Sequence, residues 1–257
     1  MVEAVVLAGG GKQEPLTEQE GVKNKAFIEI YGRPLLGYVL QALNEAPSVG
    51  KVVVVGPEPE LQSLLNRGYE FTIMPERGSM LDNLAAGFEA VDRDRLALVV
   101  TGDIPLLKPG VVEEFLGFCG NLENDFYYPV LRKEAFARLF PETERTYVRL
   151  KEGLVTGGNL GLIRPAWFLD NRARLEMFIS YRKKPLKLIK ILPFILIIKY
   201  VCKTLSISDL EAFLSKLLKL EARAVICELV ELGIDVDKVS DLDLVKQALD
   251  NLPARPG

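Results

Sequence analysis

The sequence predicts a three-layer α/β fold with a mostly parallel central sheet, plus a helical insertion in its second half. The first observation is a series of short, unbroken apolar runs at residues 4–7, 52–55, 71–74 and 96–100. Such runs are typical of strands that are buried on both faces of a parallel sheet. The second observation is that segments with apolar residues at helical spacing separate these runs, which indicates right-handed βαβ units.

The first strand, residues 4–7, leads into a turn of three glycines, Gly9 to Gly11. Residues 12–24 are polar and contain helix breakers, so we expect a loop there. Residues 26–30 are expected to be extended. Pro34 then opens a helix whose apolar side chains would face the sheet.

The next units repeat this pattern. Strand 52–55 is closed by Gly56-Pro57, and a short helix around residues 61–65 leads to strand 71–74. Ser79 is placed to cap a helix over residues 80–91. The fourth strand, residues 96–100, ends at Thr101-Gly102-Asp103.

The second half of the chain is less regular. Pro109 precedes a helix, and residues 125–163 alternate short strand-like pieces with charged turns. Further helices are expected at residues 167–181, 210–220 and 242–249, and a strand at residues 222–230. We expect a single domain over residues 1–257, with the helical insertion at residues 170–221.

The composition excludes several classes of protein. The net charge of −3 disfavours a nucleic-acid-binding protein, which usually carries a basic field. The chain has no histidine, which excludes Ser-His and Cys-His catalysis and removes the commonest zinc ligand. The three cysteines are scattered and form no C-x-x-C pair. No secretory signal is expected, because Glu3 and the glycine turn interrupt the early apolar run, and this predicts a cytoplasmic protein.

The glycine turn is the first candidate binding feature. Without a Cβ atom, glycine allows positive φ angles and lets backbone N–H groups come close to an anion. Lys12 follows the turn directly, and no acidic residue appears before Glu14. The turn is therefore interpreted as a phosphate-holding loop at the carboxyl end of a central strand; the alternative is a flexible turn.

Three acidic residues are candidate metal ligands. Asp103 follows the fourth strand, so its carboxylate should project from the carboxyl edge of the sheet. Asp235 and Asp237 alternate on an extended segment and share one face. Mg²⁺ takes one or two protein carboxylates and leaves its other positions to phosphates and water. The alternatives are that Asp103 caps a turn and that the later pair is solvated loop charge.

Together these stretches resemble the MobA-like NTP transferases, a family of sugar-nucleotide and cofactor nucleotidyltransferases. The family's L-A-G-G opening matches Leu7-Ala8-Gly9-Gly10, and its G-D-x-P-L metal motif matches residues 102–106. Its late acidic motif matches residues 235–242, and residues 24–35 match the segment around its conserved lysine. The motifs occur in family order over residues 1–168 and 222–250. The resemblance implies a GT-A-like, nucleotide-diphospho-sugar transferase-like fold.

The resemblance also implies a reaction: Mg²⁺-dependent transfer of an NMP unit from an NTP to a small phosphorylated acceptor, with release of pyrophosphate. The acceptor would be a sugar phosphate, a cofactor or an alcohol phosphate. Lys25 and Lys12 would be the catalytic cations, and Asp103 with Asp235 or Asp237 would hold Mg²⁺. The nucleotide would contact Leu7, Ala8, Gly9, Gly10, Gly11, Arg77, Gly78, Ser79 and Asn83. The acceptor side would include Gly158 and Asn159, with Tyr128, Arg145, Tyr147, Arg149 and Lys151 as further candidates.

Departures from the family pattern leave other functions open. The family usually has an arginine two or three residues past the glycines, where this chain has Gln13-Glu14-Pro15. Asn24 stands where a proline normally precedes the lysine, and Lys238-Val239 replaces Thr-Pro in the late motif. A catalytically weakened nucleotide-binding relative is therefore the first alternative. A dinucleotide-dependent oxidoreductase is the second, although the turn lacks the G-x-G-x-x-G spacing.

Residues 186–201 lie outside the resemblance. The stretch is apolar but too short and too interrupted by lysines for a spanning helix, which needs about 20 apolar residues. The basic run Arg182-Lys183-Lys184 adjoins it, as in helices that lie on an anionic membrane surface. The favoured interpretation is a helix buried against the core or a second subunit; the alternative is peripheral membrane association.

Overall fold

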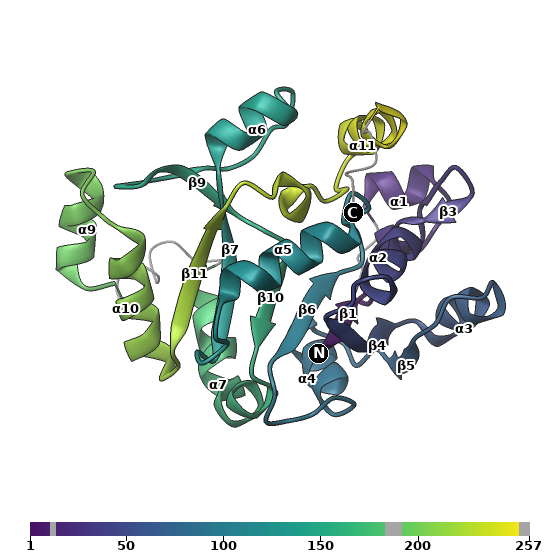
Figure 1. The fold of residues 1–257 in the computed structure, drawn as a ribbon, viewed down its shortest axis with the longest axis horizontal. Coiled ribbons are helices and arrows are strands. Elements are labelled where there is room, and N and C mark those ends of the chain that lie inside the picture. Colours follow the sequence, from purple (N-terminus) through teal and green to yellow (C-terminus); the bar gives the residue numbers. More distant parts are fainter. Residues whose placement is uncertain (11–13, 183–191, 252–257) are drawn as a thin grey trace.

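The computed structural model describes residues 1–10, 14–182 and 192–251 (Figure 1). Within these residues, nine strands form one sheet in the order β5-β4-β1-β6-β10-β7-β9-β8, and β11 pairs with β7. The strands are β1 (Val2–Leu7), β4 (Val49–Gly56), β5 (Thr72–Pro75), β6 (Ala97–Thr101), β7 (Phe126–Arg132), β8 (Val148–Leu150), β9 (Gly153–Gly157), β10 (Leu160–Ile163) and β11 (Ala222–Cys227). A separate hairpin joins β2 (Glu29–Ile30) to β3 (Arg33–Pro34).

The central strands are parallel. β1 pairs in parallel with β4 and β6, and Leu7 lies opposite both Val55 and Thr101. β10 is antiparallel to β6 and β7. β9, which precedes β10 in the chain, is also antiparallel to β7, and the bend at Gly158-Asn159 separates the two strands. The carboxyl ends of β1 and β6 therefore meet at one edge of the sheet.

Helices cover both faces of the sheet, which makes the expected three layers. One core cluster packs α2 (Leu35–Asn44), α5 (Pro109–Cys119) and α11 (Val239–Asn251) on one face. A second cluster packs α4 (Met80–Phe88) and α7 (Pro165–Arg182) on the other. The other helices are α1 (Pro15–Gln19), α3 (Glu58–Asn66), α6 (Lys133–Leu139), α9 (Phe194–Val201) and α10 (Ile207–Leu218).

Most predicted elements are present, and the differences have local causes. The expected loop 12–24 contains α1, because Pro15 suits the first turn and the Glu14 and Thr17 side chains form a capping box. Residues 26–30 begin with a 3₁₀ turn, Lys25–Phe27, because the Asn24 side chain accepts a hydrogen bond from the Ala26 N–H. The expected strand 222–230 ends at Cys227 and is followed by a second 3₁₀ turn, Val230–Gly233.

The segment expected to be an insertion consists largely of α7, α9 and α10. α9 buries only Leu196, so the chain's own core does not cover most of this helix, and burial against a second subunit stays a prediction. Residues 186–191 lie outside the described part of the chain. None of the described helices combines the length and apolar character needed to cross a membrane.

Candidate functional site

The site begins where β1 and β6 end side by side. The Gly102 N–H donates to the Leu7 carbonyl at 3.0 Å, and the Ala8 N–H donates to the Val55 carbonyl at 2.8 Å. A Cβ atom at position 102 would lie 3.2 Å from the Ala26 Cβ and 3.3 Å from the Leu7 oxygen. Glycine at 102 therefore lets the turn that carries Asp103 stay close to the turn that follows β1.

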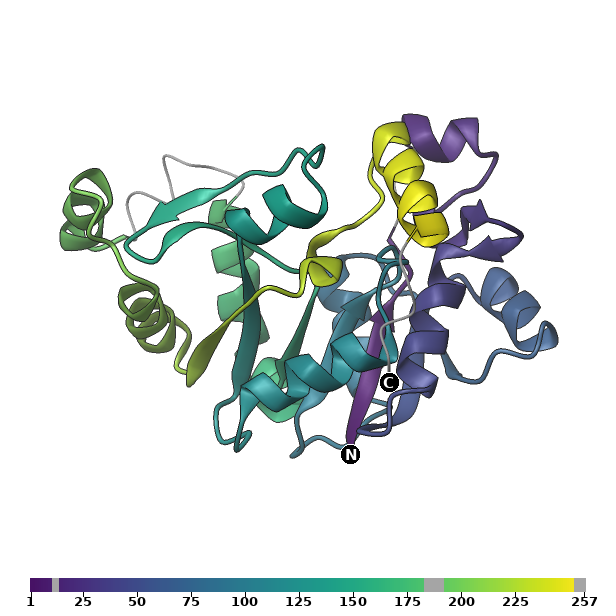
Figure 2. The same cartoon turned by 45° about the horizontal axis from the view of Figure 1, so that its top comes forward.

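The late acidic segment reaches the same edge of the sheet. The Val236 N–H donates to the Asp103 carbonyl oxygen at 3.1 Å, and the Val236 side chain is fully buried. Asp235 and Asp237 flank this anchor, so the segment is fixed beside Asp103 although it lies more than a hundred residues later in the chain. Figure 2 shows the same convergence at larger scale, with α11 at the C-terminal end lying beside α1 near the N-terminus.

Lys25 lies between these carboxylates. Its Nζ pairs with Asp237, lies 3.5 Å from Asp103 Oδ2 and 3.8 Å from Glu14 Oε2. Burial acts to lower the pKa of the Lys25 ammonium, but the carboxylates of Asp237, Asp103 and Glu14 outweigh it and raise that pKa above its ordinary value. Lys25 is therefore a fixed, fully charged cation.

The side chain of Asn24 fixes the backbone on either side of Lys25. Its Nδ2 donates to the Ala8 carbonyl at 2.8 Å, and its Oδ1 accepts from the Ala26 N–H at 2.9 Å. The asparagine thus ties the 3₁₀ turn that carries Lys25 to the turn after β1.

Asp235 faces a different cation. Arg145 Nη1 lies 3.3 Å from Asp235 Oδ1, and the Arg145 Nη2 donates to the Gly157 carbonyl at 3.4 Å. Burial raises the pKa of the Asp235 carboxyl, and the negative charges of Asp237 and Asp103 raise it further. Arg145, Asp235, Asp237 and Lys238 line a polar cleft at this edge of the sheet.

Asp103 and one of the two later aspartates are compatible with a divalent cation held by two protein carboxylates. Asp103 Oδ1 is buried and has no hydrogen-bond partner among the described residues. In that part of the chain, no three Asp, Glu, His or Cys side chains lie close enough together to hold a metal ion. Mg²⁺ bound to phosphates needs only one or two protein carboxylates, so Asp103 with one of Asp235 and Asp237 is a donor set of sufficient size.

The described glycines of the turn lie against a second wall, formed by Glu76 and Asn83. The Gly10 N–H donates to Glu76 Oε2 at 2.7 Å, and Gly10 has a φ of 77°. A Cβ atom on Gly9 would lie 2.6 Å from Glu76 Oε2 and 3.0 Å from Asn83 Nδ2. Asn83 is buried, and its Nδ2 has no hydrogen-bond partner among the described residues. Gly11 and Lys12 lie outside those residues.

The side chains of Arg77 and Ser79 are engaged elsewhere. The Arg77 guanidinium makes two 2.7 Å hydrogen bonds to Glu89 at the end of α4. The Ser79 hydroxyl caps α4 together with Asp82. The backbone around Gly78 faces the glycine turn, with the Gly78 oxygen 3.5 Å from where a Cβ on Gly10 would lie. This segment therefore offers backbone groups and Asn83, not Arg77 or Ser79, to the turn.

Gly158 and Asn159 lie at the bend between β9 and β10. The Thr101 N–H donates to the Asn159 carbonyl at 3.1 Å, and the Tyr128 hydroxyl donates to the Gly158 carbonyl at 2.9 Å. Asn159 Nδ2 and Thr101 Oγ1 are buried without a hydrogen-bond partner in the described structure. Thr101 is two residues before Asp103, so its backbone bond to Asn159 joins the bend to the carboxyl end of β6.

Glu76 is the site residue that sequence reasoning missed. It directly follows β5, so it stands at the same carboxyl edge as Gly9 and Asp103. Its position after a parallel strand was the available signal. Among the acceptor-side candidates, Arg145 reaches the acidic residues, whereas Tyr147 packs edge-on against Phe136.

Comparison with known proteins identifies relatives of this chain. The family model described as a MobA-like NTP transferase domain matches residues 4–192. A probable molybdenum cofactor guanylyltransferase from Thermococcus kodakarensis is 28% identical over 46% of this chain and 51% of that protein. A 2-C-methyl-D-erythritol 4-phosphate cytidylyltransferase from Clostridium beijerinckii is 25% identical over 44% of this chain and 50% of that protein. The chain thus spans about half the length of the curated relatives it matches.

A solved structure matches almost the whole chain. A hypothetical transferase from Thermus thermophilus has a TM-score of 0.82 and 37% identity, and the alignment covers 94% of this chain and 99% of that one. The similarity therefore extends beyond residues 4–192.

Proposed function

Because the chain belongs to the MobA-like NTP transferase family, we propose that it transfers an NMP unit from an NTP to a small phosphorylated acceptor and releases pyrophosphate. The observation that carries this proposal is the convergence of Lys25, Asp103 and the Asp235–Asp237 segment beside the glycine turn. The family assignment rejects the oxidoreductase alternative.

The reaction does not require the protein to form covalent bonds with the substrates. An acceptor phosphate oxygen attacks the α-phosphorus, and the bond from that phosphorus to the oxygen bridging to the β-phosphate breaks. Negative charge builds up on the α-phosphate and on the leaving pyrophosphate. Catalysis then depends on positioning and on fixed positive charge, which a site without histidine can supply.

Lys25 would neutralise this charge. It is held by Asn24 and by three carboxylates, so little reorganisation is needed when a phosphate replaces one of them. The backbone of the glycine turn, with Asn83 behind it, would hold the nucleotide, and Lys12 follows on the phosphate side. Gly158, Asn159 and Arg145 would face the acceptor.

Asp103 and one of Asp235 and Asp237 would hold Mg²⁺. When bound, the ion would supply further positive charge at the α-phosphate. Support for this assignment comes from the buried, unpaired Asp103 Oδ1 and from the hard oxygen donors, which suit Mg²⁺.

Pyrophosphate release in the presence of Mg²⁺ tests the proposal. The four NTPs are each combined with a panel of sugar phosphates, alcohol phosphates and a phosphorylated pterin. Release that requires one NTP and one class of acceptor is the expected result. Absence of release from every pair, with no nucleotide binding by calorimetry, would contradict it.

A catalytically weakened relative is the second candidate, and one observation favours it. Glu14 stands in the region where the family usually has an arginine, and its carboxylate lies 3.8 Å from Lys25 Nζ. Negative charge there would repel the negatively charged pyrophosphate as it leaves. Tight NTP binding without pyrophosphate release would identify this candidate, and Glu14→Arg should then increase turnover.

A further inference from the structure

The polar cleft beside Asp235 lies between two remote parts of the chain. One wall is residues 143–146, in the loop between α6 and β8, and the other is residues 234–244, which lead into α11. Figure 1 shows α6 and α11 at the same end of the molecule. The cleft has a volume of about 570 Å³, which is within the range of about 300–1,000 Å³ that is usual for small-molecule sites.

Two ion pairs join these walls at different depths. Arg145 Nη1 lies 3.3 Å from Asp235 Oδ1, and the two side chains are 15% and 27% exposed. Lys238 Nζ lies 2.9 Å from Glu144 Oε2, and these side chains are 52% and 83% exposed. The arginine pair therefore lies deeper in the cleft than the lysine pair.

Arg145 is held in position, but its donors are not fully used. Its guanidinium lies over the ring of Phe136, 5.3 Å from the ring centroid. Its bonds to Asp235 and to the Gly157 carbonyl are 3.3 Å and 3.4 Å long, whereas a guanidinium usually bonds to an anion at about 2.7–2.9 Å. Its Nε has no hydrogen-bond partner among the described residues. A phosphate in the cleft would therefore meet a planar, preoriented guanidinium that can make shorter bonds.

The cleft lies on the side of the acidic residues away from the glycine turn. In the sheet order β5-β4-β1-β6-β10-β7-β9-β8, the glycine turn follows β1 and Glu76 follows β5. Asp103 comes after β6, and Thr156 of β9 lines the cleft. Asp235 and Asp237 line it as well, on either side of the backbone bond to Asp103. A nucleotide at the glycine turn and an acceptor in the cleft would therefore approach the acidic residues from opposite sides.

The described lining of the cleft is rich in hydroxyl and carboxylate groups. It includes two apolar residues, Ile234 and Leu244, and no aromatic residue. Such a lining suits the hydroxyl groups of a sugar or polyol, which need hydrogen-bond partners when they are bound. It offers no ring on which a pterin would stack and little surface for an apolar chain. Besides the two ion pairs and Asp237, the polar lining residues are Thr143, Thr146, Thr156 and Asp241.

Carboxylates outnumber cations in the outer part of the cleft. Glu144, Asp237 and Asp241 belong to the described lining, in which Lys238 is the only cation besides Arg145. A second anionic group on the acceptor would therefore lie among like charges, which disfavours its binding. The charge of the lining thus favours an acceptor with one phosphate.

We propose that the acceptor is a polyhydroxylated monophosphate, that is, a sugar phosphate or polyol phosphate without a second anionic group, whose phosphate binds Arg145 and whose hydroxyl groups contact the polar lining of the cleft. This proposal rests on the proposed nucleotidyl transfer and selects one acceptor class among those that the transfer leaves open. It makes Arg145 the residue that recognises the acceptor phosphate.

Pyrophosphate release with matched acceptors tests the choice of acceptor class. Glycerol phosphate and ribitol phosphate are compared with propyl phosphate and pentyl phosphate, which have the same numbers of carbons but no free hydroxyl. The polyol phosphates should have a kcat/KM at least about tenfold higher, because hydroxyl-binding groups are left unpaired by the alkyl compounds. An equal kcat/KM for the alkyl phosphates would overturn the proposal, as would a higher one for a phosphorylated pterin or a sugar bisphosphate.

Two conservative variants test the residues. Arg145→Lys keeps the charge but loses the planar fork, so the KM for the polyol phosphate should rise on the order of tenfold while the KM for the NTP stays unchanged. Thr156→Val removes one hydroxyl and should raise the KM for polyol phosphates but not for alkyl phosphates. An unchanged acceptor KM in Arg145→Lys would overturn the role of Arg145.

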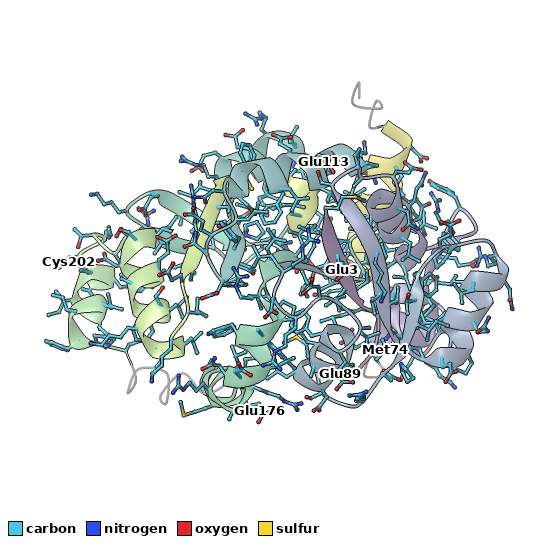
Figure 3. All side chains as sticks on the ribbon, turned by 60° about the horizontal axis from the view of Figure 1, so that its bottom comes forward. Glu3, Met74, Glu89, Glu113, Glu176 and Cys202 are labelled. Carbon is cyan, nitrogen blue, oxygen red and sulfur yellow. The ribbon has the colours of Figure 1, made fainter. Side chains whose placement is uncertain are left out.

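Arg93→Lys is the matched control, because Arg93 also pairs with an aspartate, Asp170 of α7. Figure 3 brings the lower side of Figure 1 forward and shows Glu176 of α7 there, away from α6 and α11. This variant should keep the native KM values for both substrates. Thermal unfolding checks that all variants are folded.

Calorimetry separates failure of this proposal from failure of the proposed transfer. If no pair of substrates releases pyrophosphate, ribitol phosphate should still bind the native chain in the presence of NTP and Mg²⁺, and Arg145→Lys should weaken that binding. Absence of such binding would overturn the acceptor assignment. Pyrophosphate release with the pterin alone would keep the transfer and also overturn the acceptor assignment.

Discussion

Lys25 is surrounded by more negative charge than one lysine neutralises. Asp237 pairs with it, and Asp103 and Glu14 lie within 4 Å of its Nζ. A structural ion pair needs one carboxylate, so the net negative charge around Lys25 would attract a further cation. This is the arrangement expected where a lysine and a metal ion share the binding of a triphosphate.

Replacement of Lys25 by alanine should therefore affect turnover more than folding. Loss of a fixed charge at the reacting phosphate costs roughly 10²–10³-fold in kcat, by analogy with removal of one oxyanion-stabilising donor. Pyrophosphate release under saturating NTP measures it. The control is Lys216→Ala on α10, outside the site, which should leave kcat unchanged. Equal kcat in the native chain and Lys25→Ala would remove Lys25 from the chemistry.

At this scale the sequence predicted residue types better than side-chain directions. Asp103 was found because it follows a parallel strand, and its place at the sheet edge is confirmed. Its approach to Asp235 and Asp237 could not be read from spacing, because it depends on the Val236–Asp103 backbone hydrogen bond between distant segments. The Arg77 side chain bonds to Glu89 and the Ser79 hydroxyl bonds to Asp82, and the sequence did not indicate these partners.

Helix α4 supports the candidate site through the residues of its first turn. Its capping box joins Ser79 to Asp82, and its first turn places Asn83 against Gly9. Hydrogen bonds from Ser79 and then the Arg172 ion pair lower the pKa of Asp82 from its ordinary 3.8 to about 2. The folded state therefore stabilises the ionised form of Asp82.

A pH-dependent loss of stability should follow from this cap. Because the folded pKa lies below the unfolded value, Asp82 stabilises the fold above about pH 4, and this contribution is lost as pH falls toward 2. Asp82→Asn should lower the urea midpoint at pH 6.5 and lower it less at pH 2.5. A difference between native and variant chains that is the same at both pH values would contradict the assignment.

Two glycines in helices give opposite predictions. A Cβ atom on Gly87 of α4 would lie 2.3 Å from Val5 Cγ1 and 3.1 Å from Val55 Cγ2, whereas one on Gly117 of α5 would meet nothing within 4 Å. Gly87→Ala should therefore destabilise the chain by about 1–3 kcal/mol through overpacking. Gly117→Ala should stabilise it by about 0.5–1 kcal/mol. Urea denaturation measures both, and destabilisation of equal size in the two variants would show that α4 is not packed this closely on β1.

Local sequence patterns predicted most elements because, in those elements, the spacing of apolar residues matches the faces that the fold buries. The strands at 52–55 and 96–100 are buried on both faces, so their unbroken apolar runs are a direct signature. α1 was missed because its capping box and Pro15 lie in a segment with few apolar residues. The sequence did not show which side of α9 is buried, because an apolar helix carries the same signal whichever surface covers it.

For the whole molecule, the alternation of strands and helices predicted a mostly parallel sheet, and the topology confirms it. The sequence did not show that β9 and β10 form consecutive parts of one bent strand along β7. That bend brings Asn159 to Thr101, at the carboxyl end of β6. It depends on pairing between remote segments, which a single sequence does not encode in any local pattern.

We propose that Asp103 and the Asp235–Asp237 segment together bind an NTP through a divalent cation. The measurement that tests it most directly is the thermal shift caused by NTP with and without Mg²⁺, in the native chain and in Asp103→Ala. Asp170→Asn, which alters a surface pair with Arg93, is the control. Near-saturating NTP and Mg²⁺ should raise the Tm of the native chain and the control by several degrees, on the order of 5 °C. Asp103→Ala should lose the Mg²⁺-dependent part of that shift relative to its own Tm, and an unchanged Mg²⁺-dependent shift would contradict the claim.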